Sequence, residues 1–384
     1  MAFSGFAAAL IKITLASFTL ASLLLALAHS HTAQHWRIPR SMTGLSSANE
    51  QRLTDSSATA PSWFLDHTTC ASLQETYHKF YTSTGRNTGE IMRNEDTPAS
   101  SDAPAQIWQA TPPALQELLL QPEALVQRLM SDELPNQHIL FIGDSTTFQQ
   151  IRSLRCLLEA AAFKQESMGI SPDRWRRGEQ SLLLSFIFAT SFEEVFRHLA
   201  DREPSQSLRV VIGLGAWYNS DRQTAWAGEL EQFVGSVKSI EHRLGASIYL
   251  REPLPQHFEY SDQPISDGAF RTPLEIAANF SAKPTRCAPV RDSKDWRSRV
   301  FDDKTADLPG KVLLRDMAVP MYYGHGSGHI HTGLADCTHY AAPAMHVFNA
   351  ALAQQVGRRH GWQSWRRLFS IFKSTLHPFL ELQP

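Results

Sequence analysis

Ser145, Asp336 and His339 are the three side chains whose types and spacing suggest acyl-transfer chemistry. Ser145 follows the apolar run that stops at Gly143 in ILFIGDSTTF at 139–148, and the other two lie in DCTHY at 336–340. A serine hydroxyl becomes a nucleophile when a histidine takes its proton and a carboxylate orients that histidine. Asp336 and His339 are three residues apart, a spacing that lets both side chains lie on one helical turn.

Ser145 and His339 also have ordinary structural interpretations. Ser145 stands among Asp144, Thr146 and Thr147, and any of the four could cap the helix that follows. His339 is one of 16 histidines and could be a simple loop residue. The functional interpretation gains weight because Ser145 and His339 each follow a strand and precede a helix, so both loops would face one crevice.

Alternating apolar segments predict the elements that would position these side chains. Short runs rich in Val, Ile and Leu predict buried strands at 138–143, 182–189, 208–214, 246–250 and 311–315. Helical patterns occupy 148–163, 192–200, 224–244 and 343–359. Strands that alternate with helices favour an α/β fold, a three-layer α/β/α sandwich with a mostly parallel sheet, in which functional groups gather at the carboxyl ends of the strands.

Five features follow one another along the chain. They are ILFIGDSTTFQQIRSLRCLLEA, Cys156 in its Cys-Leu-Leu position, VVIGLGAWYN at 210–219, YLREPLPQHF at 249–258 with Cys287 downstream, and DCTHYAAPAMHVFNAAL from 336. Together they resemble the PC-esterase branch of the SGNH (GDSL-like) acyl-esterase superfamily. Within that branch they are most similar to the trichome birefringence-like polysaccharide O-acetyltransferases. The resemblance covers residues 138 to 352 and implies an SGNH-hydrolase-like sandwich.

The resemblance implies a role for each matched residue. Ser145 would be the nucleophile, His339 the general base and Asp336 its orienting partner. The Ser145 backbone N–H would hold the oxyanion, with Gly215 as a second candidate donor. Asn219 could add its side-chain amide, although it lies a few residues late and a surface-turn role is the alternative.

Three positions depart from the family pattern. The plant enzymes usually have a basic residue where this chain has Phe148 and a histidine where it has Ala216, which affects the expected donor and acceptor preference. Ala341 replaces a second cysteine after the closing motif, so one familiar bridge cannot form.

The four cysteines are expected to form two disulfides in an oxidising lumen. We predict that Cys287 pairs with Cys337, because a bridge inside the catalytic loop would hold His339 in position. Cys70 would then pair with Cys156, and four buried thiols are the alternative.

The amino-terminal sequence predicts entry into the secretory pathway. Residues 1–35 contain a 16-residue uncharged run, Ile13–Ala28, which fits a signal anchor or a cleaved signal peptide. We expect a flexible stem at 36–62, an irregular flanking lobe at 63–135, the catalytic domain at 136–357 and a basic amphipathic tail at 358–384. A sequon at Asn279 fits lumenal exposure. The predicted location is the Golgi membrane, single-pass type II with a lumenal catalytic domain, and secretion is the alternative.

The overall charge limits the classes of binding partner that are expected. A net charge of -2 gives no electrostatic reason to expect nucleic acid. His325, His329 and His331 lack a nearby carboxylate or cysteine, so a Gly-rich substrate loop is expected there and no metal.

The predicted function is O-acetyl transfer from an acyl donor to a polysaccharide or glycan hydroxyl, with no bound cofactor. A carbohydrate acetylesterase and a catalytically silent glycan-binding relative are the alternatives.

Overall fold

The computed structural model describes a large part of the predicted catalytic domain and of the segment before it. The described residues are 59–65, 102–130, 136–167, 172–205, 207–216, 218, 222–257, 296–324, 338–357 and 359. All of these described residues belong to one compact unit. The predicted anchor, the sequon, most of the stem, nearly all of the tail and three of the four cysteines lie outside the described residues.

A seven-stranded sheet with the order β2-β3-β4-β1-β5-β6-β7 forms the centre of the fold. Its strands are β1 (Asn136–Gly143), β2 (Lys164–Ser167), β3 (Asp173–Arg177), β4 (Gln180–Phe188), β5 (Leu208–Gly213), β6 (Ser247–Arg251) and β7 (Lys311–Val312). The five predicted strands are confirmed as the parallel set β4-β1-β5-β6-β7. Strands β2 and β3 extend the sheet antiparallel beyond β4, which the sequence did not reveal.

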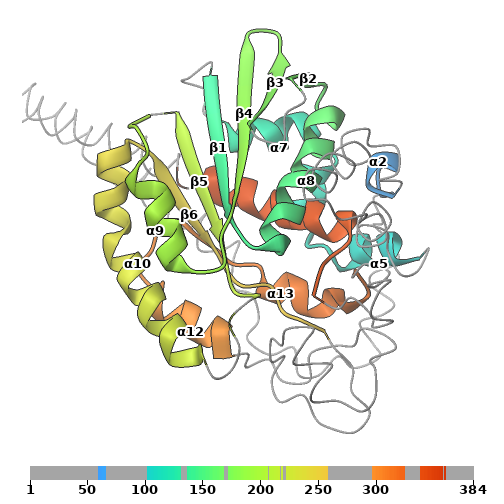
Figure 1. Ribbon diagram of the computed structural model, residues 1–384. Coiled ribbons are helices and arrows are strands. Elements are labelled where there is room, and N and C mark those ends of the chain that lie inside the picture. Colours follow the sequence, from blue (N-terminus) through green and yellow to red (C-terminus); the bar gives the residue numbers. More distant parts are fainter. Residues whose placement is uncertain are drawn as a thin grey trace, which may run out of the picture. The chain divides into compact units, whose positions relative to one another are not determined.

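Helices cover both faces of the sheet, as Figure 1 shows. One face carries α8 (Ser145–Ala160) and a helix over residues 342–357, and the other carries α9 (Phe192–Ala200), α10 (Gln223–Leu244) and α12 (Trp296–Lys304). The helix predicted at 148–163 begins three residues earlier, because Asp144 caps it. The three-layer α/β/α prediction is therefore confirmed.

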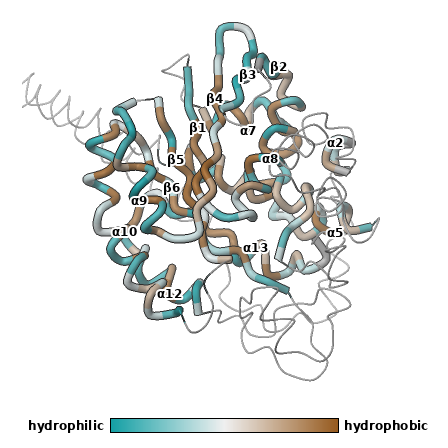
Figure 2. Tube along the Cα trace, viewed as in Figure 1, coloured by the Kyte–Doolittle hydropathy of each residue, from teal (hydrophilic) through white to brown (hydrophobic). Residues whose placement is uncertain are grey.

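Strand β1 shows why both faces need a helical layer. Ile139 and Phe141 belong to the apolar cluster under α8, whereas Leu140 and Ile142 belong to the cluster under α9 and α10. Successive side chains of a strand point to opposite faces, so a continuous apolar run is buried only between two layers. Figure 2 shows the apolar residues concentrated along these central strands.

The segment before the sheet is more regular than predicted. Its described part forms α2 (Ser62–Leu65), α5 (Ala103–Ala110), α6 (Pro113–Leu119) and α7 (Pro122–Leu129). Each of the last three has proline in its first turn, where the missing N–H is not needed. Buried residues of all four helices, such as Phe64 and Leu125, belong to the same apolar cluster as α8. None of the described helices is long and apolar enough to cross a membrane.

Candidate active site

The turn between β1 and α8 presents Ser145 at the start of the helix. The cap of α8 is Asp144, whose Oδ1 accepts bonds from the Thr146 N–H at 3.0 Å and the Thr146 hydroxyl at 2.7 Å. The capping role that Ser145 could have had therefore belongs to its neighbour. Residues 146–150 are buried, while Ser145 is partly exposed, so its hydroxyl can be reached from solvent.

Ser145 and His339 form a direct hydrogen bond. Ser145 Oγ lies 2.7 Å from His339 Nε2, although 194 positions separate the residues in the chain. With Nε2 unprotonated, the hydroxyl donates to it, which is the arrangement that a general base requires. His339 is also partly exposed. The prediction that these two side chains meet at one edge of the sheet is confirmed.

Strand order explains the position of this pair. Renumbered along the chain, the parallel strands run 2-1-3-4-5, so the chain reverses direction across the sheet between β1 and β5. Ligands of open α/β sheets bind in the crevice beyond the carboxyl ends of the strands at such a reversal. Ser145 follows β1 and Gly215 follows β5. The nucleophile therefore lies where the topology itself opens a crevice.

The loop after β5 is tied to the loop that carries Ser145. Asp144 Oδ2 accepts the Ala216 N–H at 3.0 Å, so one carboxylate fixes both loops. Gly215 has a φ of 146°, and a Cβ there would come within 2.7 Å of Pro253 Cβ, so only glycine fits. The oxyanion role of the Gly215 N–H stays a prediction. Asn219 lies outside the described residues.

Arg251 is a buried cation behind the nucleophile, and its role was missed in the sequence. Its guanidinium donates to Thr146 Oγ1 at 2.7 Å and to Gln150 Oε1 at 3.2 Å. Complete burial lowers the pKa of Arg251 to about 10, an effect that the charge of Asp144 opposes. The side chain therefore supports the turn around Ser145 from the end of β6. In the sequence, Arg251 is the first residue of the Arg-x-x-x-Pro-x-His-Phe segment, and this is the feature that could have revealed its role.

The residues on both sides of His339 are also fixed by polar contacts. Gln256 Nε2 donates to Thr338 Oγ1 at 3.0 Å, and the Tyr340 N–H donates to Gln149 Oε1 at 3.1 Å. The fully buried Tyr340 hydroxyl donates to Pro255 O at 2.9 Å. These contacts join the base loop to α8 and to the segment after β6. The position of His339 relative to Ser145 is thus set from two directions.

Phe148, the position where the plant enzymes have a basic residue, is part of the core. Its ring packs against Phe186 at a centroid distance of 5.0 Å, and the Arg152 guanidinium lies 5.5 Å from the same ring. Ala216 uses its backbone rather than its side chain, through the contact with Asp144. Neither side chain takes part in the contact between Ser145 and His339.

Several predicted residues cannot be placed in this site. Asp336, Asn279, the three histidines at 325–331 and Cys70, Cys287 and Cys337 lie outside the described residues. Cys156 is disulfide-bonded, and its pairing with Cys70 stays a prediction. Within the ranges that the structure describes, no three metal-ligating side chains come together.

Comparisons with known proteins add one distant likeness. No family model and no curated protein matches the chain. A solved structure described as "a putative SGNH hydrolase from Slackia heliotrinireducens" aligns over 58% of this chain and all of its own, with 15% sequence identity and a TM-score of 0.34. That likeness is too weak to carry an argument about function, which therefore rests on the site itself.

Proposed function

We propose that this protein is a serine acyltransferase that moves an acetyl group onto a sugar hydroxyl of a polysaccharide or glycan. The observation that carries the proposal is the 2.7 Å contact between Ser145 Oγ and His339 Nε2 at a solvent-accessible strand end. The resemblance of the motifs around both residues to the polysaccharide O-acetyltransferases supports the acceptor class.

The first half-reaction would form an acyl-enzyme. His339 Nε2 takes the hydroxyl proton as Ser145 Oγ attacks the carbonyl carbon of the acetyl donor. The carbonyl oxygen becomes an oxyanion, which the Ser145 N–H at the start of α8 can stabilise. The bond to the leaving group then breaks, and His339 returns its proton to that group. An ionised Asp336 would hold the imidazolium, a role that stays a prediction.

The second half-reaction decides the product. A sugar hydroxyl gives its proton to His339 and attacks the acetyl carbon, which frees Ser145 and leaves an acetylated sugar. Water in the same position would give acetate, so a carbohydrate acetylesterase is the alternative. The apolar leader and the closing DCTHY block favour transfer in a Golgi lumen, with the chain as a type II membrane protein. The absence of a basic side chain at Phe148 is the feature that favours hydrolysis.

A catalytically silent glycan-binding protein is disfavoured by the geometry. Such a protein has no need to keep a serine hydroxyl within hydrogen-bond distance of a histidine at the mouth of a crevice. Ser153 and His346 form a second Ser–His contact of 2.6 Å, but both side chains are almost completely buried. A third Ser–His contact among the described residues, His138 Nε2 to Ser185 Oγ at 2.9 Å, joins β1 to β4 and also has a buried serine. Of these three contacts, the Ser145–His339 pair is the one whose serine a substrate can reach.

The test uses the purified full-length chain in detergent, a small acetyl ester as donor and a panel of oligosaccharides as acceptors. Acetate release and glycan mass are followed together. Ser145→Ala and His339→Ala should each lower acetyl transfer by about a thousandfold or more, because each removes one half of the nucleophile and base pair.

Ser153→Ala is the matched control, because it breaks a Ser–His contact in the same helix at a position that no substrate can reach. It should retain acetyl transfer. Acetate release that depends on Ser145, without acetylated product from any donor or acceptor, would establish the esterase instead. Activity that survives Ser145→Ala would overturn the proposal.

A further inference from the structure

Phe188 is a half-exposed aromatic side chain at the carboxyl end of β4. It has 49% of its surface exposed, whereas the other phenylalanines of the parallel strands, Phe141 and Phe186, are buried and partly buried. Phe188 pairs with Gly143 of β1, two residues before Ser145. A large apolar side chain at this edge of the sheet therefore stands beside the nucleophile, where it has no role in the core.

The register of strand and helix places Phe188 level with Ser145. Phe148 of α8 packs against Phe186 of β4. Ser145 lies three residues before Phe148, about 4.5 Å closer to the strand ends at 1.5 Å per helical residue. Phe188 lies two residues after Phe186, about 6.6 Å farther in the same direction. Phe188 also shares the strand face of Phe186, so it points toward the layer that contains α8.

Phe188 and His339 lie on different sides of Ser145. On the surface of a helix, the residues three and four positions after a given residue both lie one turn away from it, one on each side of a line drawn through that residue parallel to the helix axis. Phe148, three positions after Ser145, contacts β4, whereas Gln149, four positions after it, contacts Tyr340 beside His339. The serine hydroxyl therefore lies between the base on one side and the strand end that carries Phe188 on the other.

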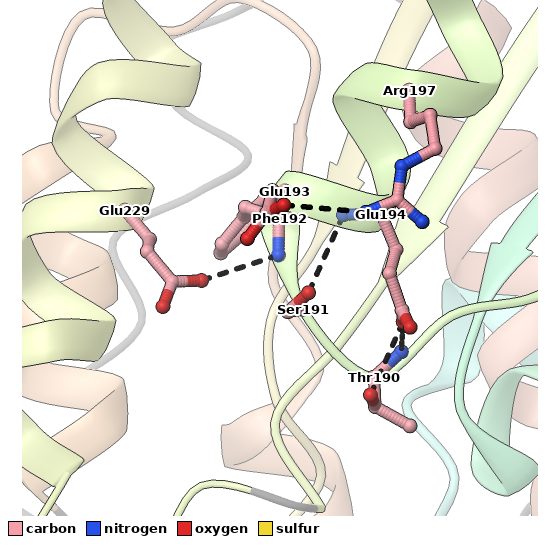
Figure 3. A network of polar contacts seen from close by, with 7 residues as sticks. All are labelled: Thr190, Ser191, Phe192, Glu193, Glu194, Arg197 and Glu229. Carbon is pink, nitrogen blue, oxygen red and sulfur yellow. Dashed lines mark hydrogen bonds and ion pairs between the residues drawn. The ribbon is translucent and has the colours of Figure 1, made fainter.

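Polar contacts hold the turn that follows Phe188, as Figure 3 shows. Glu194 Oε2 accepts the Thr190 N–H at 2.6 Å, and Ser191 caps α9 by accepting the Glu194 N–H at 3.3 Å. From α10, Glu229 accepts the Phe192 N–H at 3.3 Å. The Ala189 N–H also donates to Gly143 O at 2.9 Å. Phe188 is therefore presented by a braced turn, which lowers the entropic cost of using it to bind a ligand.

We propose that Phe188 is a substrate-binding residue that stacks against the apolar C–H face of the acceptor sugar ring. The proposal rests on the proposed function and names the subsite that would hold the acceptor. An aromatic ring offers a flat apolar surface that matches one face of a pyranose in size and polarity. The acetyl group itself is too small to cover such a ring, and it must lie at Ser145 Oγ.

Binding is measured first, because it does not depend on turnover. Ser145→Ala and the double variant Ser145→Ala/Phe188→Ala, both full-length, are titrated calorimetrically with xylo-, manno- and gluco-oligosaccharides. Loss of the ring should weaken binding of the preferred oligosaccharide about tenfold. Phe188→Trp should bind at least as well as Phe188, and Phe188→Leu should bind like the alanine variant, because stacking needs a flat ring rather than apolar area alone.

Leu120→Ala is the matched control, since Leu120 is also exposed but lies between α6 and α7 and not on a strand of the sheet. It should leave the affinity unchanged. Equal affinities of the two titrated proteins, or no binding of any oligosaccharide, would overturn the proposal. Failure of acetyl transfer alone would count against the proposed function and leave the binding result standing.

Discussion

At the scale of single residues, the site depends on three neighbouring positions of α8. Ser145 provides the hydroxyl, Phe148 packs the helix onto β4, and Gln149 holds the loop that carries the base. Because one turn of helix fixes these side chains relative to one another, the nucleophile and the contacts that place its base belong to the same rigid element.

Gln149 is a positioning residue, and its removal should reduce turnover. Gln149→Met removes the acceptor of the Tyr340 N–H while keeping the side-chain volume. We expect kcat to fall about tenfold or more with little change in KM, because a shifted His339 affects the transition state more than substrate binding. Steady-state kinetics and melting temperature are measured together.

Gln149→Glu is the control, because a carboxyl oxygen can still accept the Tyr340 N–H. It should recover most of kcat. Equal kcat values per folded molecule for the methionine variant and the parent would show that Gln149 supports the fold only.

At the scale of elements, α8 joins the predicted parallel sheet to the antiparallel strands that the sequence did not reveal. Arg155 of α8 forms a buried ion pair with Asp173 of β3, in which the side chains are 4% and 1% exposed. Burial lowers the pKa of Arg155 and raises that of Asp173, and the attraction between the two partly offsets both shifts. Each charge is therefore tolerated because the other is present.

Breaking this ion pair should be strongly destabilising. Arg155→Ala leaves Asp173 without its ion-pair partner, and we expect the free energy of unfolding to fall by about 3 kcal/mol. Arg176→Ala is the matched control, because its pair with Glu166 is largely exposed, and it should cost less than about 1 kcal/mol. Urea denaturation measures both variants. Similar small losses would show that the buried pair adds little.

At the scale of the whole molecule, the buried carboxyl group of Glu252 makes the stability of the folded protein depend on pH. Glu252, directly after β6, accepts the Leu314 N–H at 2.9 Å and the Arg315 N–H at 2.8 Å. Burial raises the pKa of Glu252 to about 7, although these two N–H bonds oppose the shift. In the unfolded chain the same carboxyl has its ordinary pKa of 4.5. The folded state thus prefers the protonated carboxyl.

The sign of the pH effect follows from this difference. The stability that Glu252 contributes is complete below its unfolded pKa and is lost as the pH rises through its folded pKa. Relative to Glu252→Gln, we expect the parent to lose up to about 3 kcal/mol of unfolding free energy between pH 5 and pH 8, from about 1.4 kcal/mol per pKa unit. Urea denaturation at both pH values measures it.

Other titrating groups do not affect this comparison. Burial and Arg202 lower the pKa of His138 to about 4, which gives the opposite pH dependence, but this contribution is the same in both proteins and cancels. A difference between parent and variant that stays constant with pH would show that Glu252 is ionised in the fold throughout.

The sequence by itself determined the order of elements and the end of the sheet at which the chemistry lies. Continuous apolar runs such as 138–143 require burial on both faces, which demands helices between parallel strands. A polar Asp-Ser pair after such a run must then fall at a carboxyl end. Strands β2 and β3 were not predicted, because their sequences, KQES and DRWRR, are mostly charged or polar. They become strands by pairing, β3 with β4 and β2 with β3. The short helices at 103–129 were not predicted from the sequence, because each is stabilised mainly by packing against the core.

Only the tertiary structure decided the contacts between distant parts of the chain. The bond between Ser145 and His339 spans 194 positions, and the Arg251 contact with Thr146 spans 105. No local sequence pattern shows that these residues meet in space. Their contacts depend on the strand order and on how closely Gly213 lets the Arg251 side chain approach. Periodicity reports which side of an element is buried, whereas hydrogen bonds and pKa shifts depend on which element is packed against it.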